Sequence, residues 1–315
     1  MRILGPPCFP AQNKYVAAGR FAPSPTGELH LGNLRTALVA WLCARSTGSR
    51  FVLRFEDLDR VTSRPEFVVS QTEDLRALGL DWDDEPLVQS TRFDAHHEAI
   101  DRLIANGHTY ECFCTRREIA EATQAPNGPS TVGPYPGRCR LLTEYQRADY
   151  RAAGRVPAVR LRSPCATASV FDRLQGPSIF PVDDVVLRRN DGVPAYNLAV
   201  VVDDAFQRVE EVVRADDLLP SAAPQQIIAR LLDLPPILYV HVPLAVNAAG
   251  QRLAKRDGAV TIRQLAAQGI SGAQALAMLA RSLDLCAPRE TPTLDQLLQR
   301  VSVDALPRQP WVAVP

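Results

Sequence analysis

The chain has 315 residues, enough for one large or two modest domains with a substantial hydrophobic core. Its 35 basic residues balance 35 acidic residues, so a nucleic-acid partner would need a local basic patch rather than attraction by net charge. No apolar run approaches the roughly 20 residues of a membrane helix, so we expect no membrane partner. The cysteines are odd in number and unevenly spaced, which argues against a disulfide framework and for a cytoplasmic protein.

Residues 1–14 lack the charged-then-apolar order of a signal peptide and are expected to form a flexible lead-in. A strand–loop–helix–strand unit is predicted next. A short apolar run at 15–18 predicts its first strand, and the two prolines within 23–27 predict a loop. Apolar residues recur at helical spacing within 32–48, and residues 51–55 predict a second strand parallel to the first.

The loop of this βαβ unit is where chemistry is expected, because a helix N-terminus there offers unpaired N–H groups and a partial positive charge. It carries His30 and Gly32. His30 can donate to phosphate oxygens, and Gly32 would let a phosphate or ribose approach the backbone closely. Neither a Walker lysine motif nor GxGxxG is present, so the loop is neither a P-loop nor a dehydrogenase fingerprint.

Residues 25–33 read Pro-Thr-Gly-Glu-Leu-His-Leu-Gly-Asn, which resembles the extended HIGH signature of class I aminoacyl-tRNA synthetases. More narrowly, residues 20–27 together with Arg-Phe-Glu-Asp-Leu-Asp at 54–59 resemble the glutamyl branch of that class. The last HIGH position is Asn33 rather than histidine, a change that this branch tolerates. A proline-rich loop with a structural histidine would explain His30 alone, but not the whole block.

Residues 74–80 continue a predicted helix, and residues 92–106 predict an amphipathic one. The acidic stretch 81–85 between them reads as a solvated turn. The three histidines of this region are expected to be surface or capping residues rather than ligands; they are His96, His97 and His108.

Three cysteines lie near a stretch rich in glycine and proline, which suggests zinc. Cys-x-Cys is tighter than the usual Cys-x2-Cys, so the spacing leaves zinc and three ordinary cysteines equally open. Cys-x-Cys followed by Tyr-x3-Cys resembles the zinc site of the glutamyl-queuosine tRNA(Asp) synthetase family, in which the tyrosine oxygen is the fourth ligand. This resemblance implies one structural zinc held by Cys112, Cys114, Tyr135 and Cys139. The remaining cysteines are expected to be small hydrophobes or bystanders: Cys8, Cys43, Cys165 and Cys286.

Beyond this insertion the pattern returns to strands and helices. Residues 157–162 and 183–189 predict strands, with a hairpin turn at 189–192. Residues 209–213 predict a buried parallel strand and 221–232 the helix after it.

Arg214 follows the strand predicted at 209–213, at the end where open α/β sheets bind ligands. Without context, this arginine is expected to pair with Asp216 or Asp217. The segment also resembles the second half of a glutamyl-type catalytic domain, in which the positions matching Tyr196 and Arg214 contact the amino acid.

Only Lys14 and Lys255 are lysines among the 35 basic residues. A lysine that survives this bias either acts as a compact charge on a phosphate or survives by chance, and composition leaves both open. Residues 237–246 predict a buried strand, 247–250 a turn, and 251–258 follow the outline of the KMSKS signature. Lys255 stands for its second lysine, while Arg252 and Ala254 replace its first lysine and its serine.

Helices are predicted at 261–268, 272–283 and 294–300, and the proline-rich end is expected to be loose. The large helical domains with which an ordinary glutamyl-tRNA synthetase grips the anticodon are not expected here. The chain is therefore similar over nearly its whole length to the glutamyl-queuosine tRNA(Asp) synthetase family. A truncated synthetase that charges a tRNA acceptor end, or a small-molecule adenylyltransferase, is the alternative.

The resemblance implies an α/β fold: a class I synthetase-type Rossmann nucleotide-binding domain with a zinc-containing insertion and a short helical C-terminal region. The expected units are a lead-in, the first catalytic half, the zinc-binding insertion, the second catalytic half, and a KMSKS-like loop with the helical region, at residues 1–14, 15–109, 110–160, 161–250 and 251–315. The implied partners are ATP with Mg²⁺, L-glutamate and tRNA(Asp) carrying queuosine, and a monomer is expected.

The charges of glutamate suggest roles within the site. Arg20 and Arg214 can each bind a carboxylate, with Arg214 favoured for the side chain, and Glu56 can accept from the ammonium. The implied glutamate site consists of Arg20, Phe21, Ala22, Pro23, Ser24, Glu56, Tyr196 and Arg214. The implied ATP site consists of His30, Gly32, Asn33 and Lys255, with His30 and Lys255 as the catalytic residues that stabilise charge on the phosphate.

Overall fold

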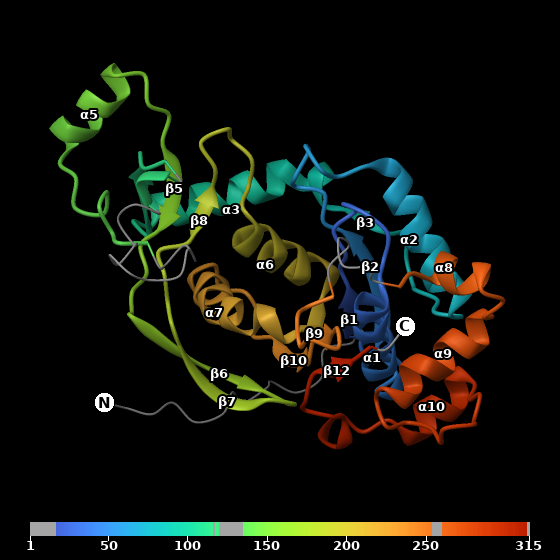
Figure 1. Ribbon diagram of the computed structural model, residues 1–315. Coiled ribbons are helices and arrows are strands. Elements are labelled where there is room, and N and C mark those ends of the chain that lie inside the picture. The colour runs from blue at the N-terminus through green and yellow to red at the C-terminus, as the bar shows by residue number, and fades with distance from the viewer. Residues whose placement is uncertain (1–16, 116, 120–134, 254–259, 314–315) are drawn as a thin grey trace.

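The computed structural model describes residues 17–115, 117–119, 135–253 and 260–313. Its central sheet has seven strands in the order β3-β2-β1-β9-β10-β6-β7, parallel except for the hairpin of β6 and β7 (Figure 1). The strands are β1 (Ala18–Phe21), β2 (Arg50–Phe55), β3 (Leu87–Val88), β6 (Thr167–Asp172), β7 (Gly176–Pro181), β9 (Val209–Ala215) and β10 (Leu238–Val242). This order, with β1 inside the sheet and connections running to both sides of it, is a Rossmann arrangement, as expected.

The first strand begins later than predicted. Residues 15 and 16 of the predicted strand lie outside the described residues, and residue 17 is not in a strand. Strand β1 is Ala18–Phe21, paired with β2 on one side and β9 on the other, so that even Arg20 is buried. Apolar character alone does not locate this strand, because its two middle residues are Gly19 and Arg20. Gly19 also fits this strand, since a Cβ on it would lie 2.9 Å from the Ala44 side chain.

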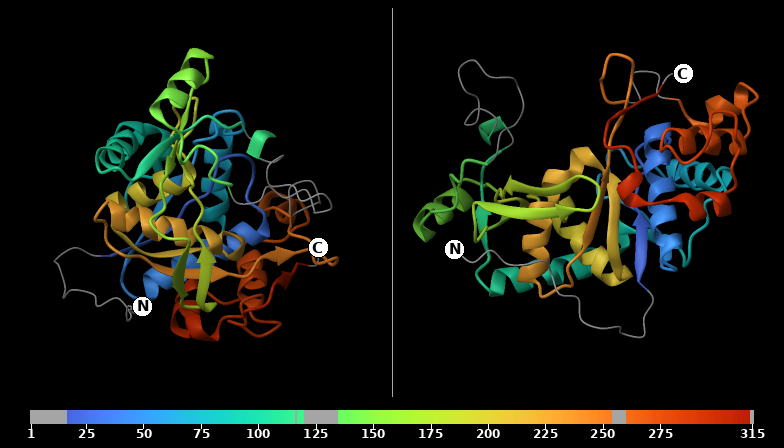
Figure 2. Two further views of the ribbon diagram at one scale, coloured as in Figure 1. Left: turned by 90° about the vertical axis from the view of Figure 1, so that its left-hand side faces the viewer. Right: turned by 90° about the horizontal axis from the view of Figure 1, so that it is seen from below.

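Two hydrophobic cores cover the two faces of the sheet. On β2, Phe51, Leu53 and Phe55 belong to one core and Val52 to the other, as the alternation of a strand requires. Helix α1 (Leu31–Ser46) lies on the face of the sheet that carries Phe51, Leu53 and Phe55, and the C-terminal helices pack against this helix. The other face carries α3 (Phe93–Ala105), α6 (Tyr196–Gln207) and α7 (Ala222–Leu231), so the fold has three layers (Figure 2).

The acidic stretch 81–85 is a largely exposed loop, as expected, but two of its carboxylates also make specific contacts. Asp81 accepts a hydrogen bond from Trp41 Nε1 at 2.8 Å, and Asp83 accepts from the Phe51 amide at 2.8 Å. Arg45 pairs with both carboxylates. The stretch therefore ties the end of α1 to the start of β2. It follows α2 (Pro65–Ala77) and precedes the 3₁₀ turn η1 (Gln89–Arg92).

A smaller antiparallel sheet joins β4 (Thr109–Cys112), β5 (Ala158–Leu161) and β8 (Val186–Arg188), and α5 (Glu144–Ala152) projects beside it. It therefore takes in β8, which lies beyond the insertion boundary expected at residue 160. The hairpin turn predicted at 189–192 is present, since the Gly192 amide donates to the Arg189 carbonyl at 3.0 Å and the Arg189 amide donates to the Val193 carbonyl at 2.9 Å. Its return arm is short, with a bridge between Arg188 and Pro194, because α6 begins directly afterwards.

The C-terminal end is tied down rather than loose. After α8 (Ile262–Ala267), α9 (Gly272–Arg281), α10 (Leu294–Arg300) and the turn η4 (Val303–Ala305), strand β12 (Trp311–Val312) pairs with β11 (Ala245–Val246). The three predicted helices are confirmed. The strand predicted at 237–246 is two strands, β10 and β11, because Pro243 interrupts it. None of the described helices has the length and apolar character that crossing a membrane requires.

Candidate active site

A cavity of about 870 Å³ opens at the carboxyl ends of β1, β2 and β9. Side chains from both halves of the chain line it. All eight residues of the expected glutamate site are among the lining residues: Arg20, Phe21, Ala22, Pro23, Ser24, Glu56, Tyr196 and Arg214. His30 and Asn33 of the expected ATP site also line this cavity, so the structure brings the two sets together.

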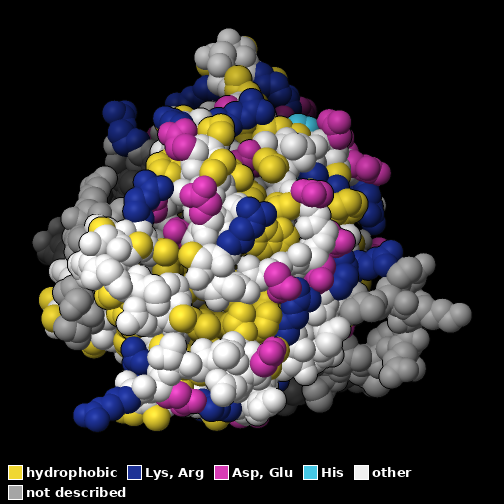
Figure 3. Space-filling view, turned by 90° about the vertical axis from the view of Figure 1, so that its right-hand side faces the viewer, with side chains coloured by type: hydrophobic (Ala, Val, Ile, Leu, Met, Phe, Trp, Pro, Cys, Tyr) yellow, Lys and Arg dark blue, Asp and Glu magenta, His cyan; other side chains and the backbone are white. Residues whose placement is uncertain are grey.

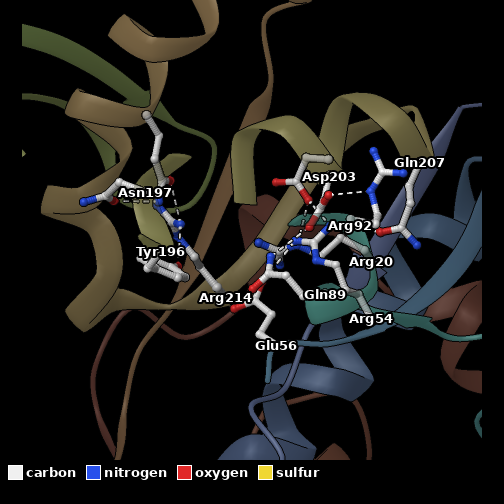
Figure 4. Close-up of polar contacts among 12 residues, drawn as sticks. Arg20, Arg54, Glu56, Gln89, Arg92, Tyr196, Asn197, Asp203, Gln207 and Arg214 are labelled. Atoms are coloured by element: carbon white, nitrogen blue, oxygen red, sulfur yellow. Dashed lines mark hydrogen bonds and ion pairs between the residues drawn. The ribbon is translucent and has the colours of Figure 1, made fainter. Parts of the chain in front are cut away.

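Arg20 and Glu56 are held by a buried charge network (Figure 4). Arg54, which is fully buried, lies 3.1 Å from Glu56 Oε1 and 2.8 Å from Asp204 Oδ1. Asp204 also lies 3.6 Å from Arg20 Nε, and Arg20 Nη1 donates to the Val213 carbonyl at 2.8 Å. Burial raises the pKa of Glu56, while Arg54 and Arg20 oppose that rise. The network fixes an arginine and a carboxylate side by side at the cavity wall.

Arg214 pairs with neither Asp216 nor Asp217, contrary to the reading without context. Its Nε donates to His241 Nε2 at 2.9 Å, and its Nη1 donates to Gln225 Oε1 at 2.8 Å and to the Tyr196 hydroxyl at 3.3 Å. The side chain is 5 % exposed. Strand β9, the neighbour of β1, brings Arg214 to the cavity wall, with Tyr196 beside it (Figure 4).

The start of α1 is built differently from our expectation. His30 is the N-cap residue, and its Nδ1 accepts from the amides of Gly32 and Asn33 at 3.1 and 3.3 Å. The Leu31 amide donates to the Val260 carbonyl at 3.0 Å. The expectation of unpaired N–H groups is therefore wrong for these three amides. A neutral imidazole that accepts at Nδ1 carries its proton on Nε2, so Nε2–H is its donor.

Gly32 has a packing reason rather than an open approach for a ligand. A Cβ at this position would lie 2.9 Å from the Ala245 side chain and 3.0 Å from atoms of the His30 ring. Gly32 does not line the cavity. Its smallness lets β11 and the His30 ring approach the first turn of α1.

The residues on both sides of the undescribed part of the KMSKS-like segment lie near His30 of the HIGH-like segment. Arg252 and Leu253 line the same cavity as His30, and Arg252 forms an ion pair with Asp217. On the far side, residue 261 forms an antiparallel bridge with His30. Lys255 lies outside the described residues.

The cysteine cluster is brought together as expected. The Sγ atoms of Cys112, Cys114 and Cys139 lie within 4.8 Å of one another, and the Tyr135 hydroxyl lies 3.3 Å from Cys112 Sγ. Zn–S bonds of about 2.3 Å in a tetrahedron place sulfurs roughly 3.8 Å apart, so the cluster fits such an ion. The Arg160 guanidinium lies 3.8 Å from the centre of the Tyr135 ring.

A second cavity of about 1340 Å³ adjoins the first and shares Ser24, Thr26, Glu56 and Tyr196 with it. It extends to the cysteine cluster, since Cys112 and Cys114 also line it. The two cavities form one continuous depression from His30 to the small sheet.

Sequence reasoning missed the buried polar residues behind the cavity: Arg54, Asp204, Gln225 and His241. It was also wrong about His96, which is fully buried with Nε2 2.9 Å from Asp203 Oδ1. Charged residues in otherwise apolar segments, such as Arg54 within 51–55 and His241 within 238–242, were the available signal.

Comparison with known proteins agrees with this geometry. A family model described as the catalytic domain of class I tRNA synthetases (E and Q) matches residues 17–313. A protein of Nocardia farcinica named glutamyl-Q tRNA(Asp) synthetase is 56% identical over 94% of this chain and 92% of its own length. One of the same name from Cutibacterium acnes is 53% identical over 85% of this chain and 76% of its own length.

Longer relatives match as well. A glutamate–tRNA ligase of Oleidesulfovibrio alaskensis is 40% identical over 92% of this chain but only 62% of its own length. The crystal structure of a glutamate tRNA ligase from Elizabethkingia meningosepticum, in complex with its amino acid, superposes with a TM-score of 0.79 and 25% identity. That superposition covers 93% of this chain and 66% of the solved chain. The chain therefore belongs to the class I (E and Q) tRNA synthetase family, in its glutamyl-Q tRNA(Asp) synthetase branch.

Proposed function

We propose that this chain activates L-glutamate with ATP and transfers the glutamyl group to queuosine in the anticodon of tRNA(Asp). The observation that carries the proposal is the cavity in which Arg20, Glu56 and Arg214 meet beside His30. Relatives that match over most of both chains and are named for this activity support the acceptor.

The charges around the cavity suit glutamate. Within the expected glutamate site, Arg20 and Arg214 are positively charged and Glu56 is negatively charged. Glutamate at neutral pH carries two carboxylates and one ammonium, hence one net negative charge. Glutamine has one carboxylate fewer than glutamate, so it would leave one of these two arginines without a carboxylate partner.

In the activation step, the ammonium of glutamate pairs with Glu56 and its carboxylates pair with Arg20 and Arg214. The α-carboxylate oxygen attacks the α-phosphorus of MgATP in line, forming the acyl–phosphate bond while the bond to pyrophosphate breaks. Negative charge grows on the phosphate oxygens, where His30 Nε2–H and Lys255 act as donors. The partial positive charge of the α1 N-terminus acts in the same direction.

In the transfer step, a hydroxyl of the acceptor nucleoside attacks the carbonyl carbon of glutamyl-adenylate, and AMP leaves with the bonding electrons. The adjoining cavity of about 1340 Å³ gives a nucleoside room beside Glu56 and Tyr196. In this proposal the anticodon loop enters from the side of the small sheet.

The cysteine cluster would hold a structural zinc ion through Cys112, Cys114, Cys139 and Tyr135. Four protein ligands leave no open position, so the ion would supply a cross-link between β4 and residues 135–139 rather than chemistry. The small core around the cluster then gains a fixed centre.

The test is glutamate transfer to two forms of tRNA(Asp) that share one sequence and differ only in whether queuosine is present. We expect labelled glutamate on the queuosine-containing form alone, still attached after the 3′ end is removed. Charging of the 3′ end of tRNA(Glu) would instead favour the second candidate, a glutamate–tRNA ligase, which the 40% identical relatives support.

A further inference from the structure

Behind Arg214 lies a histidine for which the proposed mechanism has no task. His241 sits on β10 directly opposite Arg214 in the parallel register, and its side chain has no exposed surface. Its Nε2 accepts from Arg214 Nε at 2.9 Å. A ring nitrogen that accepts carries no proton, so this contact requires neutral His241 with its proton on Nδ1.

Asp172, at the end of β6, selects that tautomer. Its Oδ2 lies 2.7 Å from His241 Nδ1 and accepts from the His241 amide at 2.9 Å. Its Oδ1 accepts from the amides of Leu174 and Gln175 at 2.9 and 2.7 Å, which fixes the carboxylate in place. Because a carboxylate only accepts, Nδ1 must donate and Nε2 must turn its lone pair toward Arg214.

Arg214 is thereby oriented before any substrate arrives. A guanidinium has five N–H groups. Nε reaches His241, Nη1 reaches Gln225 and Tyr196, and Nη2 reaches the Leu218 carbonyl at 3.2 Å. The plane and the rotation of the group are fixed, which lowers the entropic cost of binding a carboxylate in one defined pose.

We propose that Asp172 and His241 form a relay that positions Arg214 and so sets the preference for glutamate over glutamine. The inference rests on the proposed function in one respect, since it takes Arg214 to bind the side chain of glutamate. Both relay members are positioning residues that reach the substrate only through Arg214. The contacts of Arg214 leave one N–H of Nη2 for the substrate. A guanidinium turned away from its pose would move this N–H and its positive charge away from the carboxylate, and would lose the discrimination against a neutral amide.

The sharpest variant is Asp172→Asn. The side-chain amide –NH₂ of this variant, in place of Oδ2, would present a donor to His241 Nδ1. The His241 proton would then move to Nε2, where it would face the Nε–H group of Arg214. We expect the glutamate KM in pyrophosphate exchange to rise about tenfold, the loss of one charge-assisted hydrogen bond. The ratio of kcat/KM for glutamate to that for glutamine should fall by a similar factor, while the KM for ATP stays unchanged.

A second pair of variants separates positioning from folding. His241→Gln can present an oxygen near the place of Nε2, and we expect a glutamate KM within about threefold of the wild type. His241→Leu removes the acceptor and should behave like Asp172→Asn. The matched control is His96→Gln, which alters another fully buried histidine–carboxylate pair and should leave the glutamate KM and the selectivity ratio unchanged.

Two results would overturn the relay. One is a wild-type glutamate KM and selectivity in folded His241→Leu; the other is an equal loss in His96→Gln. The tautomer gives a readout independent of activity, because ¹⁵N NMR of the wild-type protein should show His241 protonated on Nδ1, and protonation on Nε2 would refute the proposal. Absence of glutamate-dependent exchange in the wild type, with the Nδ1 tautomer intact, would instead count against the proposed function.

Discussion

At the scale of single residues, Asp204 helps to hold the side chains of the cavity wall, although Asp204 itself does not line the cavity. It contacts Arg54 and Arg20 from α6, and Arg54 in turn contacts Glu56. Removing one partner of a buried ion pair typically costs about 3–5 kcal/mol, because the other charge is left uncompensated. The pose of Glu56 therefore depends on a chain of buried charges that reaches back into the protein.

The raised pKa of Glu56 predicts a pH dependence of glutamate binding. Burial raises this pKa above the usual 4.5, so on acidification Glu56 gains its proton earlier than an exposed glutamate would. A protonated Glu56 cannot pair with the ammonium. We expect the glutamate KM to rise as the pH falls from neutrality, beginning above pH 4.5, in pyrophosphate exchange measured between pH 5 and 8.

The matched variant is Glu56→Gln, which keeps the size of the side chain and cannot ionise. Its glutamate KM should be raised at least about tenfold near pH 7 and should be nearly flat over this range. Any titration of glutamate itself appears in both proteins. An acidic rise as steep in Glu56→Gln as in the wild type would assign the effect to another group.

The sequence predicted this cavity wall better than the residues behind it. Arg20, Glu56 and Arg214 stand in or beside motifs with a recognisable pattern. Asp204 and His241 act only through contacts between segments that are far apart in the chain, and no local pattern reports such contacts. Gly32 belongs to a recognisable motif, but the sequence does not show that this glycine packs against Ala245.

At the scale of elements, α2 packs one carboxyl group under the loop that precedes α1. Burial, with a smaller contribution from Glu28, raises the pKa of Asp74 to about 6, while the Leu29 amide opposes the rise. The unfolded value is 3.8, so the folded state loses stability as the pH rises from 3.8 to about 6 and remains penalised above it.

We therefore expect Asp74→Asn to raise the Tm at pH 7.5. The free energy of unfolding should increase by on the order of 1 kcal/mol once solvent screening is allowed for. The gain should shrink below pH 6 and vanish near pH 4, as thermal unfolding at several pH values would reveal. The exposed neighbour Glu73→Gln removes the same charge from the same helix and should change the Tm less. A gain for Asp74→Asn that does not depend on pH would contradict this account.

The metal prediction concerns the cysteine cluster at the end of β4. Cys139→Ser removes one thiolate from the cluster, and we expect the purified protein to hold less than half of the wild-type zinc by elemental analysis, with a lower Tm. Cys165→Ser is the control, because Cys165 lies outside the cluster. Full zinc content in Cys139→Ser would show that the thiols are not the ligands.

Elements with strong periodicity were predictable, and those set by tertiary pairing were not. Helix α10 has the predicted bounds, Leu294–Arg300, because Thr293 caps it and its apolar face is regular. The β6–β7 hairpin was not predicted, because Thr167–Asp172 mixes polar and apolar residues and gains its place by pairing Tyr239 of β10 with Asp172. The sequence does not predict helix α6, since its valine-rich run suits a strand equally well.

At the scale of the whole molecule, two segments more than 200 residues apart in the sequence meet around one cavity. His30 and residue 261 form a bridge, while Arg252 and Leu253 line the cavity that His30 also lines. The surface over α2, α8, α9 and α10 shows acidic and basic side chains interspersed, consistent with the zero net charge (Figure 3). The described residues of that face show no large patch of a single sign for RNA.

The measurement that tests this account most directly is ATP–pyrophosphate exchange by the purified chain in the absence of any tRNA. We predict exchange that depends on glutamate and is at least about a hundredfold weaker in kcat/KM with glutamine, since Arg20 and Arg214 line the cavity of the chain alone and only glutamate brings a carboxylate for each. Exchange that appears only after tRNA(Glu) is added, or that proceeds equally well with glutamine, would contradict it.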